Sequence, residues 1–402
     1  METLLYTTNK FRSFFDNITK NLFLKDDLNL KHYRNATIVI DKKSERIGLF
    51  DSDGNGIPDA SLTRHNNKKH PLPKYKLSSS DDFIDEDVIC CFNLNQHFGH
   101  FLIEGLTLLW PLVSEPYKSY KIVFASTFHK KLPDYIINFL EILGIKSEQI
   151  LYTTKTTRFR NVLVPEQAGV ISSYSSRHMA KLYKTIADNV SDTRNKSDMQ
   201  KIYVSRVKFG QHKDFGELKI QNIFEKNGYT VIYPETLSLT QQISLLSKCS
   251  HLAGLCGTAL HLSVFMPQGG TVIAMRRTTA LDSPDAVQYL LNKITGLNSV
   301  FIDTSIETHE SPHWSLDFPQ IVGVTKYLRQ FFDDNKFEYT DADLKTNQAD
   351  MENYEIVYAK WQKKQKKIKK LKPIIRLLTI VLPRRSWRRK CRNWFENVLH
   401  VK

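Results

Sequence analysis

Cysteine is scarce in this 402-residue chain, and its five cysteines include no CxxC pair. Their number is odd and Cys90 and Cys91 are adjacent, an arrangement that suits a reducing compartment better than a disulfide framework. No stretch approaches the ~18 consecutive apolar residues of a membrane span. The first residues also lack the basic region and apolar core of a signal peptide. These absences predict a cytoplasmic protein, either free or peripheral to a membrane.

Acidic residues are nearly absent from the end of the chain, and there the positive charge collects. The formal net charge is +15; residues 361–402 hold fifteen Lys and Arg against one acid, which gives +14 and leaves about +1 for the rest. Lys363–Lys372 is followed by an apolar piece of about half a bilayer span, then by further cations and tryptophans. This composition favours an anionic membrane surface as the partner of the tail. Nucleic acid binding is the less favoured alternative, and packing of the apolar piece against the first domain is a third.

An acidic, glycine-bearing stretch near the start of the chain, Asp51–Gly56, resembles a calcium loop. The twelfth position of such a loop falls on Leu62, where a bidentate acid is required. Asp-Gly and Asn-Gly between the strand-like Arg46–Phe50 and the residues after it are also a strong hairpin signal. We therefore predict a hairpin here and no metal site.

Strand-like and helix-like segments alternate through most of the chain, which predicts an α/β protein with parallel sheets and helices on both faces. A polar linker near residue 195 separates two such domains. The predicted organisation is an N-terminal segment with a β-hairpin (1–80), an α/β domain (81–195), a second and clearer α/β domain (196–310), a helical return segment (311–360) and the basic tail (361–402).

In the second domain, polar and glycine residues follow the predicted strands. Ser205, Arg206 and Lys208 come after one strand, and Gly254, Cys256 and Gly257 lie at the end of another. The run Thr258-Ala259-Leu260 then opens a helix whose first amides would face an anion. Arginine suits bidentate phosphate contacts and lysine acts as a point charge. Glu235, after a third strand, is placed to accept a ribose hydroxyl; packing glycines, a solvated basic loop and a turn acid are the alternatives.

The first domain carries a polar stripe on an apolar segment. If the helix begins at Gln96, His97, His100 and Glu104 fall on one face, and His100 and Glu104 are four residues apart. The carboxylate would then orient the imidazole, and a cleft, a ligand or a buried network must satisfy the stripe. A structural His–Glu pair is the alternative. Zinc fits poorly, because no third ligand stands at a familiar spacing.

These motifs together resemble glycosyltransferase family 61. The similarity comprises residues 95–110, Ile202–Arg206, Tyr233-Pro234-Glu235 with Gln241, and Gly254–Ile273, in the family's order, and covers roughly residues 35–305. The resemblance implies a GT-B fold, in which two Rossmann-like domains face each other across a cleft, with the acceptor on the N-terminal side. It also implies inversion at the anomeric carbon without a metal or other cofactor. Cys256 stands where the family usually has His, and Thr258 where Ala is usual.

The predicted function is therefore transfer of a sugar from a nucleotide sugar to a growing capsular or surface polysaccharide, with a lipid-linked acceptor at the inner face of the cell membrane. His100, held by Glu104 and flanked by His97, is the predicted base, although Glu104 itself is an alternative. The predicted donor-binding residues are Ser205, Arg206, Lys208, Glu235, Gly254, Cys256, Gly257, Thr258, Ala259 and Leu260. The rival hypotheses are a non-catalytic nucleotide- or nucleic-acid-binding protein and a sugar-phosphate transferase.

Overall fold

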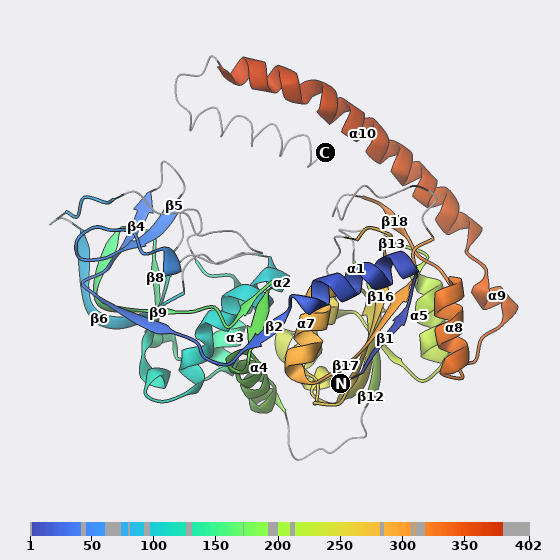
Figure 1. The fold of residues 1–402 in the computed structure, drawn as a ribbon, viewed down its shortest axis with the longest axis horizontal. Helices are drawn as coiled ribbons and strands as arrows, with labels where there is room; N and C mark the ends of the chain where they lie inside the picture. The colour runs from blue at the N-terminus through green and yellow to red at the C-terminus, as the bar shows by residue number, and fades with distance from the viewer. Residues whose placement is uncertain are drawn as a thin grey trace.

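The computed structural model describes residues 2–41, 46–60, 74–78, 81–91, 97–125, 131–171, 173–191, 200–209, 214–281, 285–306, 309 and 318–380. Over these residues the chain is a mixed α/β protein. Two large sheets stand beside each other with helices between and around them (Figure 1). The first sheet is formed mainly by residues before 170 and the second mainly by residues after 199.

The second sheet holds six strands, and every neighbouring pair in it is parallel. Its order is β14 (Thr230–Ile232), β12 (Gln200–Val204), β15 (Cys249–Leu255), β16 (Thr271–Arg276), β17 (Asn298–Asp303) and β1 (Thr3–Tyr6). From β12 the chain first adds β14 on one side and then β15 on the other. The winding therefore reverses between β12 and β15, and ligands of open α/β sheets bind beyond the carboxyl ends of the strands at such a point.

Both faces of the second sheet are buried, as the apolar strands predict. Ile202 and Val204 of β12 pack into one core, whereas Tyr203 between them packs into another. The first face is covered by α1 (Asn9–Lys20), α6 (Leu239–Leu246), α7 (Asp285–Thr295) and the 3-10 helix η7 (Thr258–Phe265), and the second by α5 (Glu217–Lys226) and α8 (Lys326–Asp334). The expected parallel sheet with helices on both faces is confirmed for this half.

The first sheet combines a parallel centre with an antiparallel edge. It contains β5 (Arg46–Phe50), β4 (Thr37–Asp41), β9 (Thr157–Pro165), β6 (Asp82–Cys90), β7 (Lys121–Ala125) and β8 (Ile150–Thr153) in this order, and β3 (Leu30–Arg34) also pairs with β9. Strands β9, β6, β7 and β8 run parallel, whereas β3, β4 and β5 are antiparallel to their partners. Short helices connect the strands: α3 (Asp134–Ile142) and the 3-10 turns η1 (Pro58–Ala60), η4 (Tyr117–Ser119) and η5 (Ser147–Gln149).

The predicted reversal after β5 is present. Phe50 bridges Gly56, and the Asp51 carboxylate accepts the backbone amides of Asp53 and Asn55 at 2.9 and 2.8 Å. Gly54 has φ of 78°, which favours glycine. The antiparallel partner of β5 is β4, which precedes it, so the described residues after Gly56 continue into η1 and form only the single bridge at Gly56. The Asp51 carboxylate is therefore occupied by its own turn.

The first 25 residues contact both halves of the molecule. They form one helix, α1, with strands on either side. Strand β1 pairs with β17 at the edge of the second sheet, and β2 (Phe23–Lys25) pairs with β11 (Tyr174–Ser176), which in turn pairs with β10 (Gly169–Val170). The domain boundaries expected from the sequence remain a prediction, but β1 lies in a sheet formed mostly by residues 200–303.

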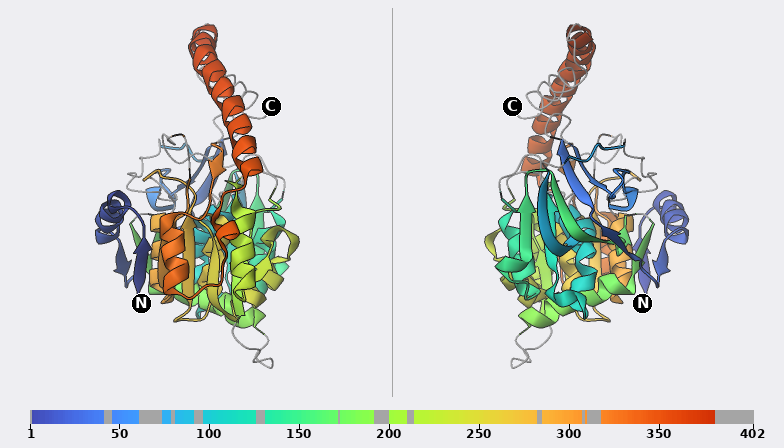
Figure 2. Two further views of the ribbon diagram at one scale, coloured as in Figure 1. Left: turned by 90° about the vertical axis from the view of Figure 1, so that its right-hand side faces the viewer. Right: turned by 90° about the vertical axis from the view of Figure 1, so that its left-hand side faces the viewer.

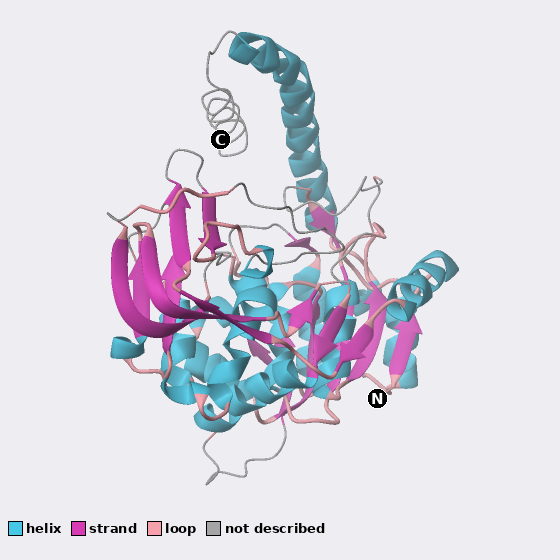
Figure 3. Ribbon diagram, turned by 60° about the vertical axis from the view of Figure 1, so that its left-hand side comes forward, coloured by secondary structure: helices cyan, strands magenta, loops and turns pink. Residues whose placement is uncertain are grey.

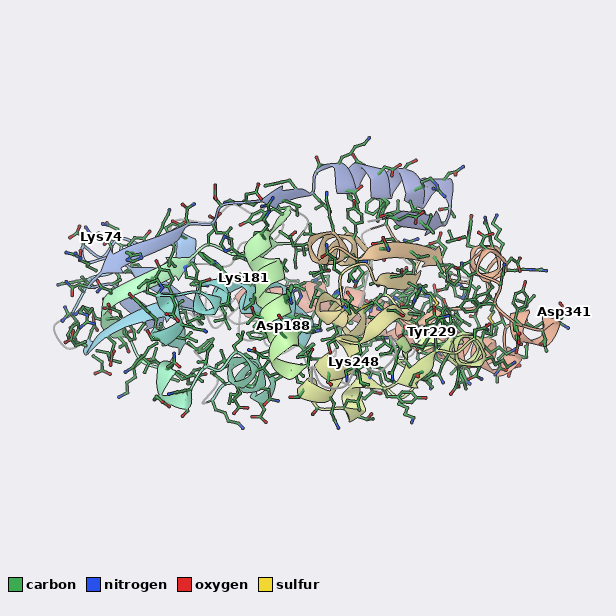
Figure 4. The ribbon with its side chains drawn as sticks, turned by 90° about the horizontal axis from the view of Figure 1, so that it is seen from below. Lys74, Lys181, Asp188, Tyr229, Lys248 and Asp341 are labelled. Carbon is green, nitrogen blue, oxygen red and sulfur yellow. The ribbon has the colours of Figure 1, made fainter. Side chains whose placement is uncertain are left out.

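One apolar core is continuous between the two halves. Helix α4 (Arg177–Val190) lies between them, and Figure 4 labels Lys181 and Asp188 on it. Its Tyr183 hydroxyl donates to the carbonyl of Leu102 in the first half at 2.9 Å, and its ring packs edge-on against Phe265 of the second half at 5.9 Å. Figure 3 shows helices filling the space between the two groups of strands. The halves are therefore held together by packed side chains.

The last described element is the long helix α10 (Gln348–Ile380), which follows the short α9 (Asp341–Leu344). It begins against the two-stranded sheet of β13 (Asp214–Phe215) and β18 (Gln320–Ile321) and then leaves the body of the molecule (Figures 1 and 2). Three aromatic residues dock its first half: Tyr354 on Phe215, Tyr358 on His309, and Trp361 on Phe318. The helix thus continues across the boundary predicted at residue 361, and residues 381–402 of the tail lie outside the described part.

Candidate active site

The polar stripe of the first half follows β6 in the chain. The stripe predicted from the sequence assumes one regular helix that begins at Gln96. The structure instead has a helical turn α2 (Phe98–His100), a π-helical turn η2 (Phe101–Gly105) and a 3-10 helix η3 (Leu106–Val113). A π-helical turn inserts an extra residue and is frequent at functional sites. The helix also begins two residues later than assumed, so His97 is extended at its N-cap.

His100 and Glu104 form the pair that their spacing predicted. The Nδ1 of His100 lies 3.0 Å from Oε2 of Glu104, and the Glu104 side chain is fully buried while that of His100 is 40% exposed. A buried carboxylate holds a proton on Nδ1, which leaves the lone pair on Nε2. The ring of His97 lies 5.4 Å from that of His100, centroid to centroid. The stripe therefore offers one oriented imidazole with a second beside it.

Arg206 stands at the carboxyl end of β12, as predicted. Its Nε donates to Oδ2 of Asp214 at 2.8 Å, and its backbone amide donates to Oε1 of Glu217 at 3.0 Å. The Arg206 side chain is 11% exposed. The preceding Ser205 is buried, and its hydroxyl donates to Gln221 at 2.7 Å. Of this predicted donor-binding pair, the structure thus places Arg206 at the surface of the site and Ser205 in the packing beneath it.

The glycine turn lies at the end of β15, beside Arg206. A Cβ atom at Gly257 would lie 3.2 Å from Nη1 of Arg206 and 3.8 Å from Nη2 of Arg277. Two guanidinium groups therefore approach the same glycine from the neighbouring strand ends, β12 and β16. Such a group of cations beside the first turn of a helix is suited to an anion.

Other residues predicted around this turn serve packing. A Cβ at Gly254 would meet the Val204 carbonyl at 2.9 Å, so glycine allows β15 to approach β12. Leu260 is 1% exposed and belongs to the core, and Ala259 packs against that core. Cys256 is buried, and burial together with Asp285 raises the pKa of its thiol well above the ordinary value. Its thiol is therefore neutral and packed among other groups.

Lys208 and Glu235 lie on the β14 side of Arg206, opposite the glycine turn that follows β15. Both are exposed, and Nζ of Lys208 lies 3.8 Å from the centre of the Tyr233 ring, at the end of β14. Glu235 follows in the 3-10 turn η6 (Pro234–Thr236). The structure therefore arranges the predicted residues in a row along strand ends β14, β12 and β15, although it does not join Glu235 to Arg206 by a direct contact among those it describes.

Three ionisable residues of this site were missed from the sequence: Asp214, Glu217 and Arg277. Nη1 of Arg277 donates to both carboxylate oxygens of Asp214, at 2.8 and 3.1 Å. Burial raises the Asp214 pKa, but Arg277 and Arg206 outweigh it and hold that pKa below the ordinary value. Burial lowers the Arg277 pKa and raises the Glu217 pKa to about 7. The sequence held one signal, because Arg276-Arg277 stands at the end of β16 just as Arg206 follows β12.

Arg276 serves a different role from Arg277. Its Nε donates to Asp285 at 2.8 Å, it pairs also with Asp303, and its guanidinium lies 3.4 Å from the centre of the Phe11 ring. One arginine here meets two carboxylates, and its side chain is 2% exposed. Arg276 therefore ties β16 to α1 and α7, away from the glycine turn.

The two halves of the site touch at Gly99. A Cβ at this glycine would lie 2.8 Å from Oγ1 of Thr258, the first residue of η7. His261, on the same 3-10 helix, is a further residue that the sequence did not indicate. Burial, helped by the nearby charges of His100 and His97, lowers its pKa to about 4. The structure therefore brings the stripe of the first half to the glycine turn of the second.

A chain of buried amides fixes the ring of His261. Nε2 of Gln288 donates to Asn292 at 2.8 Å and to Ser263 at 2.9 Å, so its Oε1 faces Nδ1 of His261, 2.8 Å away. Nδ1 of His261 therefore carries the proton, and Nε2 is the acceptor. Among the described residues, no group of three or more His, Cys, Asp or Glu side chains is arranged to hold a metal ion.

Comparison with known proteins agrees with the resemblance predicted from the sequence. The sequence model of the family Glycosyltransferase 61 matches residues 98–273, a region that begins with α2 and ends in β16. No curated protein matches the chain. One solved structure with a partial likeness is the bacterial iron-containing dodecameric glycosyltransferase TibC from enterotoxigenic E. coli H10407. It is 11% identical, the match covers 62% of this chain and 74% of that one, and the TM-score of 0.25 is too low to support an argument.

Proposed function

Since the chain is an enzyme of glycosyltransferase family 61 by the match over residues 98–273, we propose that it moves a sugar from a nucleotide-sugar donor to a glycan acceptor with inversion at the anomeric carbon. The donor diphosphate binds beyond strand ends β12, β15 and β16, where Arg206 and Gly257 lie. The observation that supports this proposal most is the position of these residues at the winding reversal of a parallel sheet. The acceptor binds on the side of the first half, in a GT-B arrangement.

The reaction is a single displacement. The acceptor hydroxyl oxygen attacks the anomeric carbon, the new carbon–oxygen bond forms, and the bond from that carbon to the diphosphate oxygen breaks. The hydroxyl proton passes to Nε2 of His100, whose other nitrogen is held by Glu104 at 3.0 Å. The negative charge that develops on the leaving diphosphate is stabilised by Arg206 and by the amides after Gly257. The contact between Gly99 and Thr258 supports this division of roles, because it joins the two sets of residues.

The acceptor in this proposal is a growing capsular or surface polysaccharide carried on a lipid, and α10 brings the enzyme to the membrane. Six of the seven lysines in Lys363–Lys372 are exposed, and Ile374 and Leu377 beyond them are 50% and 66% exposed. Each Lys or Arg near an anionic surface contributes about 1 kcal/mol to binding. None of the described helices has both the length and the apolar character to cross a membrane. In this proposal the exposed lysines of α10 bind the enzyme to the inner surface of the membrane.

A thermal-shift screen against nucleotides and nucleotide sugars tests the donor assignment. We expect one nucleoside diphosphate family to raise the melting temperature, and Arg206→Ala to abolish that rise. Arg160→Ala is the matched control, because Arg160 also pairs with aspartates but lies on the first sheet. Stabilisation by nucleic acid and by no nucleotide would contradict the proposal and favour the binding protein.

Co-sedimentation with vesicles tests the membrane assignment. The protein should pellet with phosphatidylglycerol-containing vesicles at low salt but remain in solution with phosphatidylcholine alone. Replacing Lys366, Lys367 and Lys370 by Gln should weaken the binding. The same replacement at three exposed lysines of the first half, Lys118, Lys131 and Lys146, should leave it unchanged. Equal loss in both triple variants, or no pelleting at all, would contradict a membrane role for α10.

A further inference from the structure

Three charged side chains beside the glycine turn form one connected group. The Asp214 carboxylate receives Nε of Arg206 at 2.8 Å and Nη1 of Arg277 at 2.8 Å. The exposed fraction of the side chains falls from 11% for Arg206 to 6% for Arg277 and 4% for Asp214. Arg206 is therefore the most exposed of three largely buried side chains.

The group contains two guanidinium groups and one carboxylate, and this balance of charges affects Arg206. If Asp214 paired with Arg206 alone, the carboxylate would neutralise the guanidinium that the donor diphosphate needs. Arg277 supplies a second positive charge to the same carboxylate, so the three groups together carry +1. The nearby Arg276 shows the reverse ratio, with two carboxylates around one guanidinium, and it lies away from Gly257. The excess of positive charge is therefore placed at the turn.

The nitrogens that face the turn differ from those that bind Asp214. Asp214 takes Nε of Arg206, while the Arg206 atom nearest to a Cβ at Gly257 is Nη1. The Arg206 backbone amide is held from below by Glu217, whose carboxylate also accepts the Tyr203 hydroxyl at 3.3 Å. The guanidinium of Arg206 is thus fixed along one edge and presents its other edge toward Gly257, which suits a bidentate phosphate contact.

We propose that Asp214 and Arg277 are positioning residues of the donor site: Asp214 fixes the orientation of Arg206, and Arg277 offsets the charge of Asp214 so that Arg206 remains a net cation for the diphosphate. This inference rests on the proposed function. Among the described residues, Glu217 is a further ionisable side chain beside the group, and it holds the backbone of Arg206. Neither Asp214 nor Arg277 needs to touch the substrate.

The test is a set of charge-exchange variants assayed by calorimetry with uridine, adenosine and guanosine diphosphates and with inorganic pyrophosphate, which needs no particular base. Arg277→Gln leaves Asp214 to neutralise Arg206, so we expect pyrophosphate affinity to fall by about tenfold or more. The double variant Asp214→Asn with Arg277→Gln removes both charges and returns the group to +1. Its affinity should recover to within about threefold of the parent protein. Melting temperatures verify that each variant is folded.

Asp214→Asn alone is a second, independent test of the proposal. It remains usable if the Arg277→Gln protein does not fold. It makes the group more positive but frees the orientation of Arg206. We therefore expect pyrophosphate to bind as tightly as in the parent protein or more tightly, while kcat falls more than KM rises. A residue that only supports the fold would not improve anion binding. The control is Arg276→Gln, which should lower the melting temperature and leave pyrophosphate affinity unchanged.

The outcomes separate this inference from the proposed function. Parent-like pyrophosphate affinity in Arg277→Gln, or a double variant as weak as Arg277→Gln, would overturn the inference. So would an Asp214→Asn protein that binds pyrophosphate less tightly. If the parent protein itself binds none of the diphosphates, and Arg206→Ala changes nothing, the proposed function fails as well. Weakening by Arg206→Ala together with parent-like Arg277→Gln would leave the proposed function intact and refute the inference alone.

Discussion

The substitution Gly99→Ala tests the contact between the two halves, because it adds one methyl group at the point where they meet. A Cβ there would lie 2.8 Å from Oγ1, 2.9 Å from Cγ2 and 3.3 Å from Cβ of Thr258. Two of these distances are too short for any real Cβ, so Gly99→Ala must separate α2 from η7 or displace Thr258. Overpacking of this kind costs about 1–3 kcal/mol of unfolding free energy. The change should also lower transfer activity, since it separates His100 from the glycine turn.

Thr258→Ala provides the matched background. It removes both atoms closer than 3.0 Å and leaves the Thr258 Cβ position at 3.3 Å, which a small adjustment accommodates. In that background Gly99→Ala adds a better helix former to α2, and the expected effect is neutral to a gain of about 0.5–1 kcal/mol. The change in unfolding free energy caused by Gly99→Ala should thus be a loss in the parent protein and neutral or a gain in the Thr258→Ala background. Urea unfolding of the four proteins measures this coupling.

An additive cycle would refute this reasoning. If Gly99→Ala changes the unfolding free energy by the same amount in the parent protein and in the Thr258→Ala background, the two residues do not touch. The described apposition of α2 and η7 would then be wrong, and with it the argument that His100 faces the donor site. A coupling of about 1–4 kcal/mol would support both.

The remaining predictions concern catalysis, pH and the C-terminal helix. Glu104→Gln keeps the shape of the buried pair but removes its charge, so kcat should fall by about 10²–10⁴-fold in an assay of nucleotide release; His178→Gln on α4 is the control, and near-full activity of Glu104→Gln would exclude the proposed base. Because folding raises the Glu217 pKa to about 7 from 4.5, its stabilising contribution is present below about pH 4.5 and lost as the pH rises through 7. Glu217→Gln should therefore match the parent at pH 5 and exceed it by up to about 3 kcal/mol at pH 8 in urea unfolding, and parallel pH curves would contradict this. Tyr354→Ala should lower the unfolding free energy by about 3–5 kcal/mol, because this α10 side chain is fully buried against Phe215, and a loss below about 1 kcal/mol would show that the helix does not dock there.

Local chemistry made part of the fold predictable. The capping box of Ser238 and Gln241 is present at the start of α6, and Gly228, with φ of 82°, follows α5 as expected of a glycine that ends a helix. These signals involve residues a few positions apart and need no knowledge of the rest of the chain. The same holds for His100 and Glu104, whose four-residue spacing brings the side chains together.

The features that sequence reasoning missed depend on distant partners. Nothing local distinguishes a π-helical turn at Phe101–Gly105 from a regular helix. Its partners include residues far along the chain, because β10 contacts it and the Tyr183 hydroxyl of α4 donates to the Leu102 carbonyl. Asp214 became part of the site only because Arg277, 63 residues later, reaches the same strand ends. Likewise, the pairing of β1 with β17 joins residues almost 300 positions apart. Predictions based on the spacing of nearby residues do not detect such partners.

The pairing of β1 with β17 has a consequence for synthesis of the chain. Thr3–Tyr6 leave the ribosome before their partner residues Ser299–Ile302, which are made about 290 residues later. At about 5–20 residues per second, β1 waits roughly 15–60 s without its partner. Because β1 is the outermost strand, the other five strands can assemble before it. Docking of β1 and α1 is therefore a late step in the folding of the chain during synthesis. In a nascent chain stalled before residue 298, the β1 and α1 segments should be sensitive to protease.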